Sequence, residues 1–114
     1  MLIKNITKKR IVAADYKLCD GNLSRFIGLM FSKKQGQTLI FKFKKEQIIS
    51  LHMLFVFYPI DVLFLDKKKI VKDLKEHFKP FAFYKSKKKS MYVIELPNGI
   101  TKKTKTEIGD KIRF

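Results

Sequence analysis

The sequence predicts one compact, mainly β domain spanning residues 1–114, built as a β-sandwich of the jelly-roll kind or as a partly open barrel. Short apolar runs rich in β-branched and aromatic residues recur along the chain, and turn residues or lysines separate them. With 114 residues, of which 46% are apolar and 13% aromatic, the chain is long enough for one hydrophobic core. One stretch near residues 22–31 has helical spacing instead, so one short helix is expected there.

Eight segments are expected to form strands. Seven of them are residues 2–6, 10–18, 37–43, 46–53, 60–66, 70–77 and 91–97, and the eighth closes the chain after a turn at Gly109–Asp110. Pro59 separates two of these segments because proline fixes φ and cannot donate to a ladder. The run "DKKK" at residues 66–69 predicts a hairpin turn, and residues 79–90 are expected to form a loop with an aromatic patch.

The expected helix depends on four apolar residues at positions i, i+3, i+4 and i+7. They are Leu23, Phe26, Ile27 and Met30. This spacing gives a helix one apolar stripe. Asn22 or Asp20 is suited to cap its first turn.

Residues 51–65 are the most apolar stretch, with one carboxylate, Asp61, and one imidazole, His52. The stretch is too short to span a bilayer, which takes about 20 apolar residues. We therefore expect two core strands that are broken at Tyr58–Pro59 and no membrane span. The amino terminus lacks the continuous apolar segment and the small-residue cleavage site of a signal peptide, so a cytoplasmic location is expected.

The chain is strongly basic, with 26 Lys and Arg residues against 10 Asp and Glu residues and a net charge of +16. Such a balance is typical of proteins that bind nucleic acid, anionic membranes or other polyanions. The excess is spread evenly, since residues 1–57 and residues 58–114 each carry a net charge of +8. Nearly all of it is lysine, which acts as a solvated point charge, whereas arginine is favoured for bidentate recognition.

The single cysteine, Cys19, excludes an internal disulfide and any multi-cysteine zinc site, and a small core side chain is the simplest interpretation of it. His52, His77 and the scattered acidic residues do not cluster as metal ligands do. No metal and no cofactor are expected.

Four short motifs resemble, in their order and spacing, the DUF192 family of small single-domain proteins. They are "RFIGLM" (residues 25–30), "PIDVLFLD" (59–66), "VIELPNG" (93–99) and "IGDKI" (108–112). The resemblance covers about residues 10–114. It implies a compact, β-rich, jelly-roll-like fold and brings no established activity or cofactor.

The chain departs from the family pattern ahead of Pro59. Many bacterial members carry a Trp-Met-Lys-Asn-Thr run there and also an export signal. This chain keeps Met53, has His52 in place of the tryptophan, and has apolar residues 54–56 in place of the polar triplet. A ligand held by that triplet in relatives is therefore not expected to be held in the same way here.

The candidate ligand pocket consists of the few polar or adaptable side chains in or beside these motifs. They are Arg25, His52, Met53, Asp61 and Glu95. A carboxylate inside an apolar strand is costly unless it is paired, hydrogen-bonded or protonated. Asp61 and Glu95 are therefore either structural braces, paired with loop backbone or with Arg25, or parts of a site in which they act as ligand anchors or as an acid–base pair.

A second candidate site is a polyanion surface in the predicted loop. Its residues are Phe81, Phe83, Tyr84, Lys85, Lys87, Lys88 and Lys89. Aromatic side chains among lysines can stack on bases while the lysines neutralise phosphates. The alternative is that the lysine runs, here and at residues 67–69, are solvated turns that discourage edge pairing.

The favoured hypothesis is a non-enzymatic binding module for a small molecule or a peptide. The first alternative is sequence-tolerant binding of nucleic acid or another polyanion through the lysine-rich surface. The second is an enzyme that uses Asp61 and Glu95, so enzymatic activity stays open and is not favoured.

Overall fold

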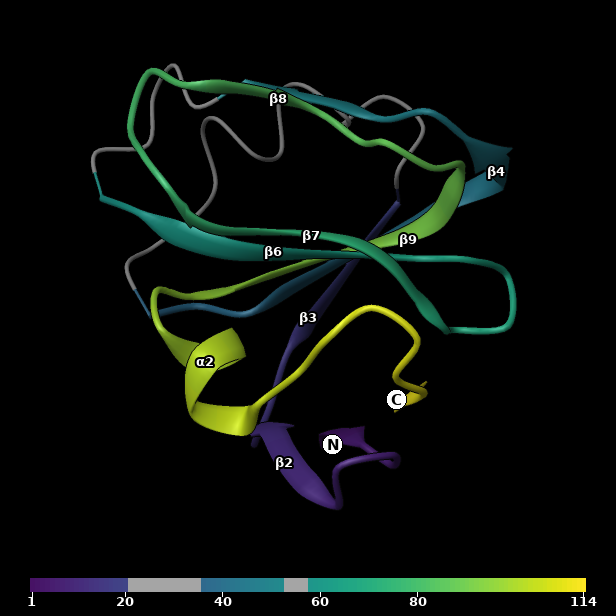
Figure 1. Ribbon diagram of the computed structural model, residues 1–114, viewed down its shortest axis with the longest axis vertical. Helices are drawn as coiled ribbons and strands as arrows, with labels where there is room; N and C mark the ends of the chain where they lie inside the picture. Colours follow the sequence, from purple (N-terminus) through teal and green to yellow (C-terminus); the bar gives the residue numbers. More distant parts are fainter. Residues whose placement is uncertain (21–35, 53–57) are drawn as a thin grey trace.

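The computed structural model describes residues 1–20, 36–52 and 58–114 of the protein (Figure 1). The strands are β1 (Ile3–Asn5), β2 (Arg10–Ala13), β3 (Lys17–Asp20), β4 (Leu39–Gln47), β5 (Ser50–His52), β6 (Ile60–Leu65), β7 (Val71–Phe78), β8 (Phe83–Lys85), β9 (Ser90–Pro97) and β10 (Ile112–Arg113), and the helix is α2 (Ile100–Thr104). The helix expected at residues 22–31 lies outside the described residues.

The centre of the fold is a five-stranded sheet in the order β3-β4-β9-β6-β7. All of its neighbouring strands are antiparallel except β3 and β4, which run parallel. The two-stranded sheet of β5 and β8 lies over one face, and α2 with the three-stranded sheet β10-β1-β2 lies against the other (Figure 1). The mainly β, sandwich-like class is therefore confirmed, and the sheets of the described residues are not closed into a barrel.

The two faces of the central sheet have separate hydrophobic cores. The core toward β5 and β8 is built around Phe41, Phe64 and Phe78, and Tyr84 packs against it. Apart from Tyr92, the buried side chains of the core toward the chain ends are aliphatic. Residues such as Ile40 come from the same strands at alternate positions.

This double coverage explains the apolar run that ends at residue 65. All six residues of β6 are buried, because β6 lies between β7 and β9 and both of its faces are covered. A strand that is buried on both faces reads as a continuous apolar run and not as an alternating one. Among the described helices, none is both long and apolar enough to cross a membrane.

Some predicted boundaries are wrong. Residues 10–18 contain β2 and the first half of β3, and the predicted strand at 46–53 is divided between the end of β4 and the whole of β5. The predicted loop at residues 79–90 contains β8, which was missed because its only inward side chain is Tyr84. Helix α2 was also missed, since its five residues show no apolar stripe and its two ends are set by the left-handed residues Gly99 and Lys105.

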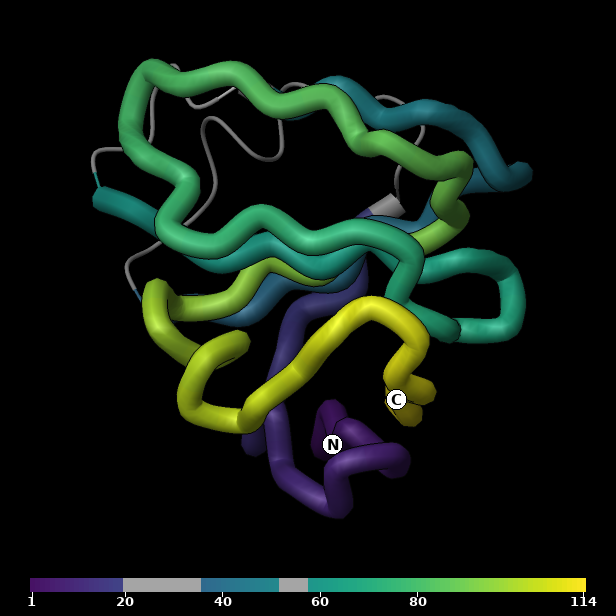
Figure 2. Tube along the Cα trace, in the orientation of Figure 1, coloured from purple at the N-terminus to yellow at the C-terminus, as the bar shows by residue number. Residues whose placement is uncertain are grey.

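The chain ends lie side by side below the central sheet, where β1 pairs with β10 (Figure 2). A buried polar cluster joins them. Asn5 donates to Asp110 (2.8 Å) and to the Thr106 hydroxyl (3.1 Å), and the Lys8 ammonium lies 2.9 Å from the Asp110 carboxylate. The Glu107 backbone N–H donates to the same carboxylate (3.1 Å).

Burial by itself raises the pKa of Asp110, but the hydrogen bonds from Asn5, Lys8 and the Glu107 backbone, with the charge of Lys8, lower the pKa below its ordinary value of 3.8. A carboxyl group with a lowered pKa in the folded state stabilises the fold above its unfolded pKa. That contribution is lost as the pH falls through the folded pKa.

We predict that Asp110→Asn lowers the free energy of unfolding by about 1–3 kcal/mol near neutral pH, since the buried donors lose a charged acceptor. The difference from the parent protein should begin to shrink when the pH falls below about 3.8, the ordinary pKa of the carboxyl group, and should disappear as the pH falls through the lower pKa of Asp110 in the folded protein. Urea unfolding of the variant and of the parent protein, at neutral pH and at acidic pH, measures this difference in the free energy of unfolding. Asp15→Asn is the matched control, because the Asp15 side chain is 84% exposed, and it should be nearly neutral. An equal loss at acidic and neutral pH would contradict the prediction.

Candidate functional site

The two carboxylates of the predicted pocket do not meet. In the β6–β9 ladder Asp61 is opposite Leu96, and Glu95 is opposite Val62. Residues directly opposite one another point to the same face of a sheet and neighbours along a strand alternate, so Asp61 and Glu95 point to opposite faces. A shared acid–base pair, or a single pocket lined by both carboxylates, would need the two side chains on one face, and the register of the two strands separates them.

Asp61 is 1% exposed and faces α2. One of its oxygens accepts from the His77 backbone N–H (3.0 Å), and the other accepts from those of Gly99 (3.1 Å) and Thr101 (2.9 Å). These three bonds hold the turn before α2 and the end of β7 against β6. Charged acceptors that bind several backbone N–H groups repay the cost of their burial.

Glu95 is fully buried on the opposite face of the sheet, between Leu39 on β4 and Val62 on β6. Cys19 and Tyr58 pack against the same core. Burial, and to a smaller extent the charge of Glu95, raises the pKa of the Tyr58 hydroxyl. The pKa of the Cys19 thiol is also raised, first by burial, with Lys17 acting against the shift and Glu95 adding to it. Cys19 is therefore a protonated thiol near neutral pH, which is a weak nucleophile.

The other predicted pocket residues are placed only in part. Arg25 and Met53 lie outside the described residues. His52 ends β5, and its Cα is opposite that of Phe83 on β8. Among the described residues, no group of three or more His, Cys, Asp or Glu side chains is arranged to hold a metal ion.

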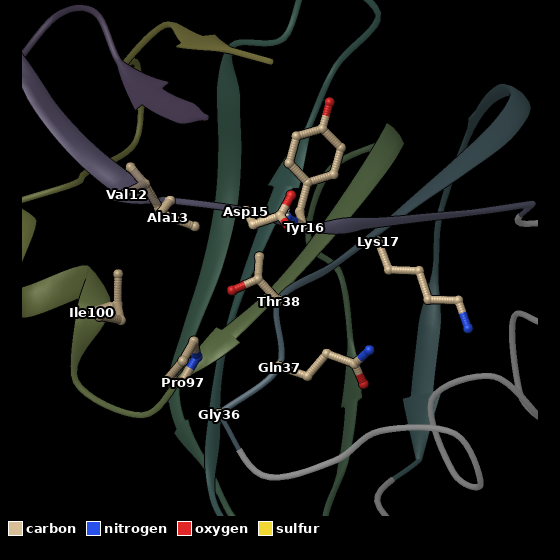
Figure 3. A pocket seen from close by; sticks show the side chains of 11 residues that line it. Val12, Ala13, Asp15, Tyr16, Lys17, Gly36, Gln37, Thr38, Pro97 and Ile100 are labelled. Carbon is tan, nitrogen blue, oxygen red and sulfur yellow. Dashed lines mark hydrogen bonds between the residues drawn. The ribbon is translucent and has the colours of Figure 1, made fainter. Parts of the chain in front are cut away.

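One open pocket of about 560 Å³ lies where β2, β3 and β4 approach α2 (Figure 3). Its walls are residues 12–17, residues 36–38, Pro97 and Ile100. Most of the lining is small side chains and backbone, with Tyr16 and Thr38 toward the middle of the view (Figure 3). The three predicted pocket residues that the structure describes, His52, Asp61 and Glu95, do not line it.

A second cavity, of about 580 Å³, is lined mostly by lysine and is called here the basic groove. Its lining residues are Glu46, Asp66, Lys67, Lys68, Lys72, Lys88, Lys89 and Ile108. They come from the end of β4, the β6–β7 hairpin, the β8–β9 turn and the segment after α2. Segments far apart in sequence thus bring five ammonium groups to one concave surface.

The β6–β7 hairpin has a fixed backbone. Asp66 accepts from the backbone N–H groups of Lys68 (2.9 Å) and Ile70 (3.0 Å), the arrangement of an Asx turn. Lys67 donates its backbone N–H to Glu46 (2.8 Å), which ties the hairpin to the end of β4. The backbone positions of Lys67 and Lys68 are therefore set by hydrogen bonds, while their side chains are exposed.

The β8–β9 turn is also tied down. Ser86 accepts from the Ile49 backbone N–H (2.9 Å), and it donates to the Lys88 carbonyl (3.1 Å). Asp73 accepts from the Lys87 backbone N–H (2.8 Å). This second set of bonds presents Lys88 and Lys89 from the other side of the groove.

The groove has a positive excess because its five lysines outnumber its two carboxylates, and both carboxylates already have partners. Asp66 lies 3.7 Å from the Lys72 ammonium in addition to its two backbone bonds, and Glu46 holds the hairpin. Within residues 1–20, 36–52 and 58–114, the other four groove lysines, at positions 67, 68, 88 and 89, form no ion pair. Four ammonium groups are thus available to an anion.

Lys69, the last lysine of the hairpin run, does not belong to this surface. Its left-handed backbone (φ 64°) turns the chain, and its ammonium lies 3.9 Å from the centre of the Phe114 ring. Burial, followed by the nearby charges of Lys111 and Lys42, lowers its pKa. This lysine serves the junction with the carboxyl terminus.

The predicted aromatic patch is divided between core and surface. Tyr84 points inward, stacks against Phe64 (5.7 Å between ring centres) and donates its hydroxyl to Asp73 (2.7 Å). Burial, and then the hydrogen bond to Asp73, raises the pKa of Tyr84 to about 12. Phe81 and Phe83 are 65% and 56% exposed. The predicted surface therefore keeps two of its three aromatic residues.

Sequence analysis missed the groove residues outside the predicted loop. The sequence predicts Lys67 and Lys68 as turn lysines and places Lys72 within a strand. The only available signal was that two lysine runs each fell at the turn of a hairpin. Nothing in the sequence says that the two turns lie at the same end of the sheet.

The fold and its surface define a small β-rich domain with an open basic groove. The model of the DUF192 family, described as "Uncharacterized ACR, COG1430", matches residues 3–114, and the chain belongs to this family. It is 38% identical to a UPF0127 protein of Pyrococcus furiosus, over 96% of this chain and 95% of that one. It is 36% identical to a UPF0127 protein of Pyrococcus horikoshii, over 99% of this chain and 98% of that one.

Two solved structures share the fold. One is a protein from Sinorhizobium meliloti 1021, described as a candidate transcription regulator, with a TM-score of 0.82 and 20% identity over 98% of this chain and 89% of that one. The other is a protein of unknown function from Novosphingobium aromaticivorans, with a TM-score of 0.82 and 16% identity over 99% of this chain and 82% of that one. At these identities the likeness concerns the fold alone.

We predict that Asp61→Asn lowers the free energy of unfolding by about 1–3 kcal/mol, because an amide replaces a carboxylate that accepts three backbone N–H bonds. Amide hydrogen exchange at Gly99 and Thr101 should become faster. Urea unfolding and exchange detected by NMR measure the two effects. Glu76→Gln is the control. Glu76 is exposed and lines a surface depression that Asp61 also lines. Unchanged protection of both amides would rule out the bracing role.

Proposed function

We propose that this protein binds polyanions built on a phosphate chain, and that the basic groove is the binding site. The observation that carries the proposal is the convergence of five lysines from separate segments on one cavity whose two carboxylates are already engaged. Solvated turn lysines that only discourage edge pairing have no reason to face a common hollow.

The size of the groove favours joint action of its charges. A volume of about 580 Å³ corresponds to a width on the order of 10 Å, which is also about the Debye length at 0.1 M salt. A phosphate chain inside the groove would therefore feel all of the lining lysines at once. Exposed charges farther apart than this are largely screened from one another.

The kind of cation indicates sequence tolerance. Lysine contacts phosphate as a point charge, whereas arginine supplies the planar, bidentate geometry that reads base edges. Among the residues that the structure describes, the groove lining contains lysine and no arginine. The net charge of +16 adds a long-range field that would raise the rate of encounter with any polyanion.

We predict that the double variant Lys88→Gln, Lys89→Gln weakens binding of inorganic polyphosphate roughly tenfold at low salt. It should also lower the slope of log affinity against log salt by about two, since two counterion-releasing contacts are lost. Calorimetric titration over a salt series measures both quantities.

The charge-matched control is Lys102→Gln, Lys103→Gln. These exposed lysines lie on α2, away from the hairpin end of the sheet (Figure 1). The control should bind polyphosphate nearly as the parent protein does. Equal weakening in the two double variants would mean that diffuse surface charge does the binding, and the groove proposal would fail.

A second candidate function is binding of a small molecule or a peptide, and the pocket of Figure 3 favours it. Its volume, about 560 Å³, lies in the range of about 300–1,000 Å³ that is typical of ligand sites. This candidate keeps the hypothesis of a non-enzymatic binding module and moves it away from Asp61 and Glu95.

We predict that some members of a small-molecule fragment set show saturation-transfer NMR signals with the parent protein and lose them with Ala13→Phe, which fills the pocket wall. Ile11→Phe is the control, because Ile11 lies on the same strand, is exposed and does not line the pocket. Signals that survive Ala13→Phe would place the fragments elsewhere and remove support from this second candidate.

A further inference from the structure

We infer that the outer face of β8 extends the basic groove into a binding site for single-stranded nucleic acid. The inference rests on the proposed function, since the groove supplies the phosphate contacts. It adds the class of polyanion, because exposed aromatic rings beside the groove select for unpaired bases.

The side chains of β8 and the residues after it alternate between two faces. Tyr84 and Ser86 point inward, where Tyr84 donates to Asp73 and Ser86 accepts from the backbone N–H of Ile49. Phe83, Lys85 and Lys87 are exposed and occupy the alternate positions, so they share the outer face of this segment. An aromatic ring and two ammonium groups thus form one row that leads to Lys88 and Lys89 in the groove.

Phe81 extends the row by another exposed ring. It has a left-handed backbone conformation (φ 64°) in the turn that the Ala82 backbone N–H closes onto the Lys79 carbonyl (3.2 Å), and it is 65% exposed. The turn fixes the backbone of Phe81, and the exposure makes its ring accessible to a ligand beside the lysines.

The chemistry of the row fits unpaired bases. Aromatic rings stack on bases of any sequence while lysines neutralise the backbone, which is how sequence-tolerant single-strand binders work. A duplex hides the faces of its bases inside the stack and offers only phosphates and groove edges. Inorganic polyphosphate offers phosphates alone. A comparison of the single strand, the duplex and polyphosphate therefore separates the contribution of base stacking from that of charge.

The row of side chains on β8 is long enough to contact a short single-stranded oligonucleotide. The five residues from Phe83 to Lys87 are separated by four steps of about 3.3 Å and therefore span about 13 Å. At about 3.4 Å per stacked nucleotide this corresponds to roughly four nucleotides, before the groove itself is counted. A thymidine oligonucleotide of about twelve nucleotides is therefore long enough to occupy the row and the groove.

The test is fluorescence anisotropy of a labelled single-stranded thymidine dodecamer, with a duplex of equal length and with inorganic polyphosphate as a competitor, at about 0.1 M salt. We expect the single strand to bind at least about fivefold more tightly than the duplex, the least that one stacked base contributes. Phe83→Leu keeps an apolar side chain and removes the aromatic face, so it should weaken single-strand binding by about fivefold or more. Phe83→Tyr keeps an aromatic face, so this variant should bind the single strand about as tightly as the parent protein does.

Phe81→Gly is the second variant, because glycine accepts the left-handed conformation without strain. It should weaken single-strand binding and leave polyphosphate binding unchanged, with its thermal unfolding as the check on folding. Ile11→Ala is the control, since Ile11 is an exposed apolar residue on β2 that does not line the groove, and it should have little effect.

The outcomes separate the two proposals. If polyphosphate binds but the single strand shows no preference over the duplex, or if the Phe83 and Phe81 variants bind it normally, the inference is overturned and the groove proposal stands. If neither polyphosphate nor oligonucleotide binds, both are overturned. Preferential binding of the single strand that depends on both rings and on Lys88 and Lys89 would support both.

Discussion

The fold depends on the antiparallel pairing of β6 with β9 in the middle of the central sheet. The two strands are buried along almost their whole length, with one core on each face. Because strand neighbours alternate between faces, this one register sends Asp61 to the side of α2 and Glu95 to the side of β5 and β8. A slip of one residue would exchange every core side chain, so the register is strongly specified.

The candidate site is a consequence of the same sheet. The turn of the β6–β7 hairpin and the turn that leads into β9 lie at one end of it, and each is fixed by a carboxylate, Asp66 or Asp73, that accepts backbone N–H groups. Asp66 also pairs with Lys72, and the remaining lysines beside the turns outnumber the acidic groups of the groove. Gathering like charges does not help the chain to fold, which is why we assign the groove a role in binding.

Much of the fold follows from the amino-acid sequence, and the failures have local causes. The apolar run of β6 and the turn signals on either side of it identify a buried strand and a hairpin. Helix α2 is short and has no apolar stripe, so the sequence does not reveal it. Its first turn is fixed by Asp61, which lies on another strand. Strand β8 has one inward residue between two outward ones, and such a short element becomes visible only when its partner β5 is beside it.

The sequence by itself determined the β-rich class, the excess of lysine and the need of Asp61 for hydrogen-bond partners, because composition, alternation and the cost of burying a charge are local properties. It also determined the family, through four motifs in order. Only the tertiary structure decided that Asp61 and Glu95 lie on opposite faces and that two distant lysine turns form one groove. Faces and neighbouring turns depend on strand register and sheet order, which are set by contacts between residues far apart along the chain.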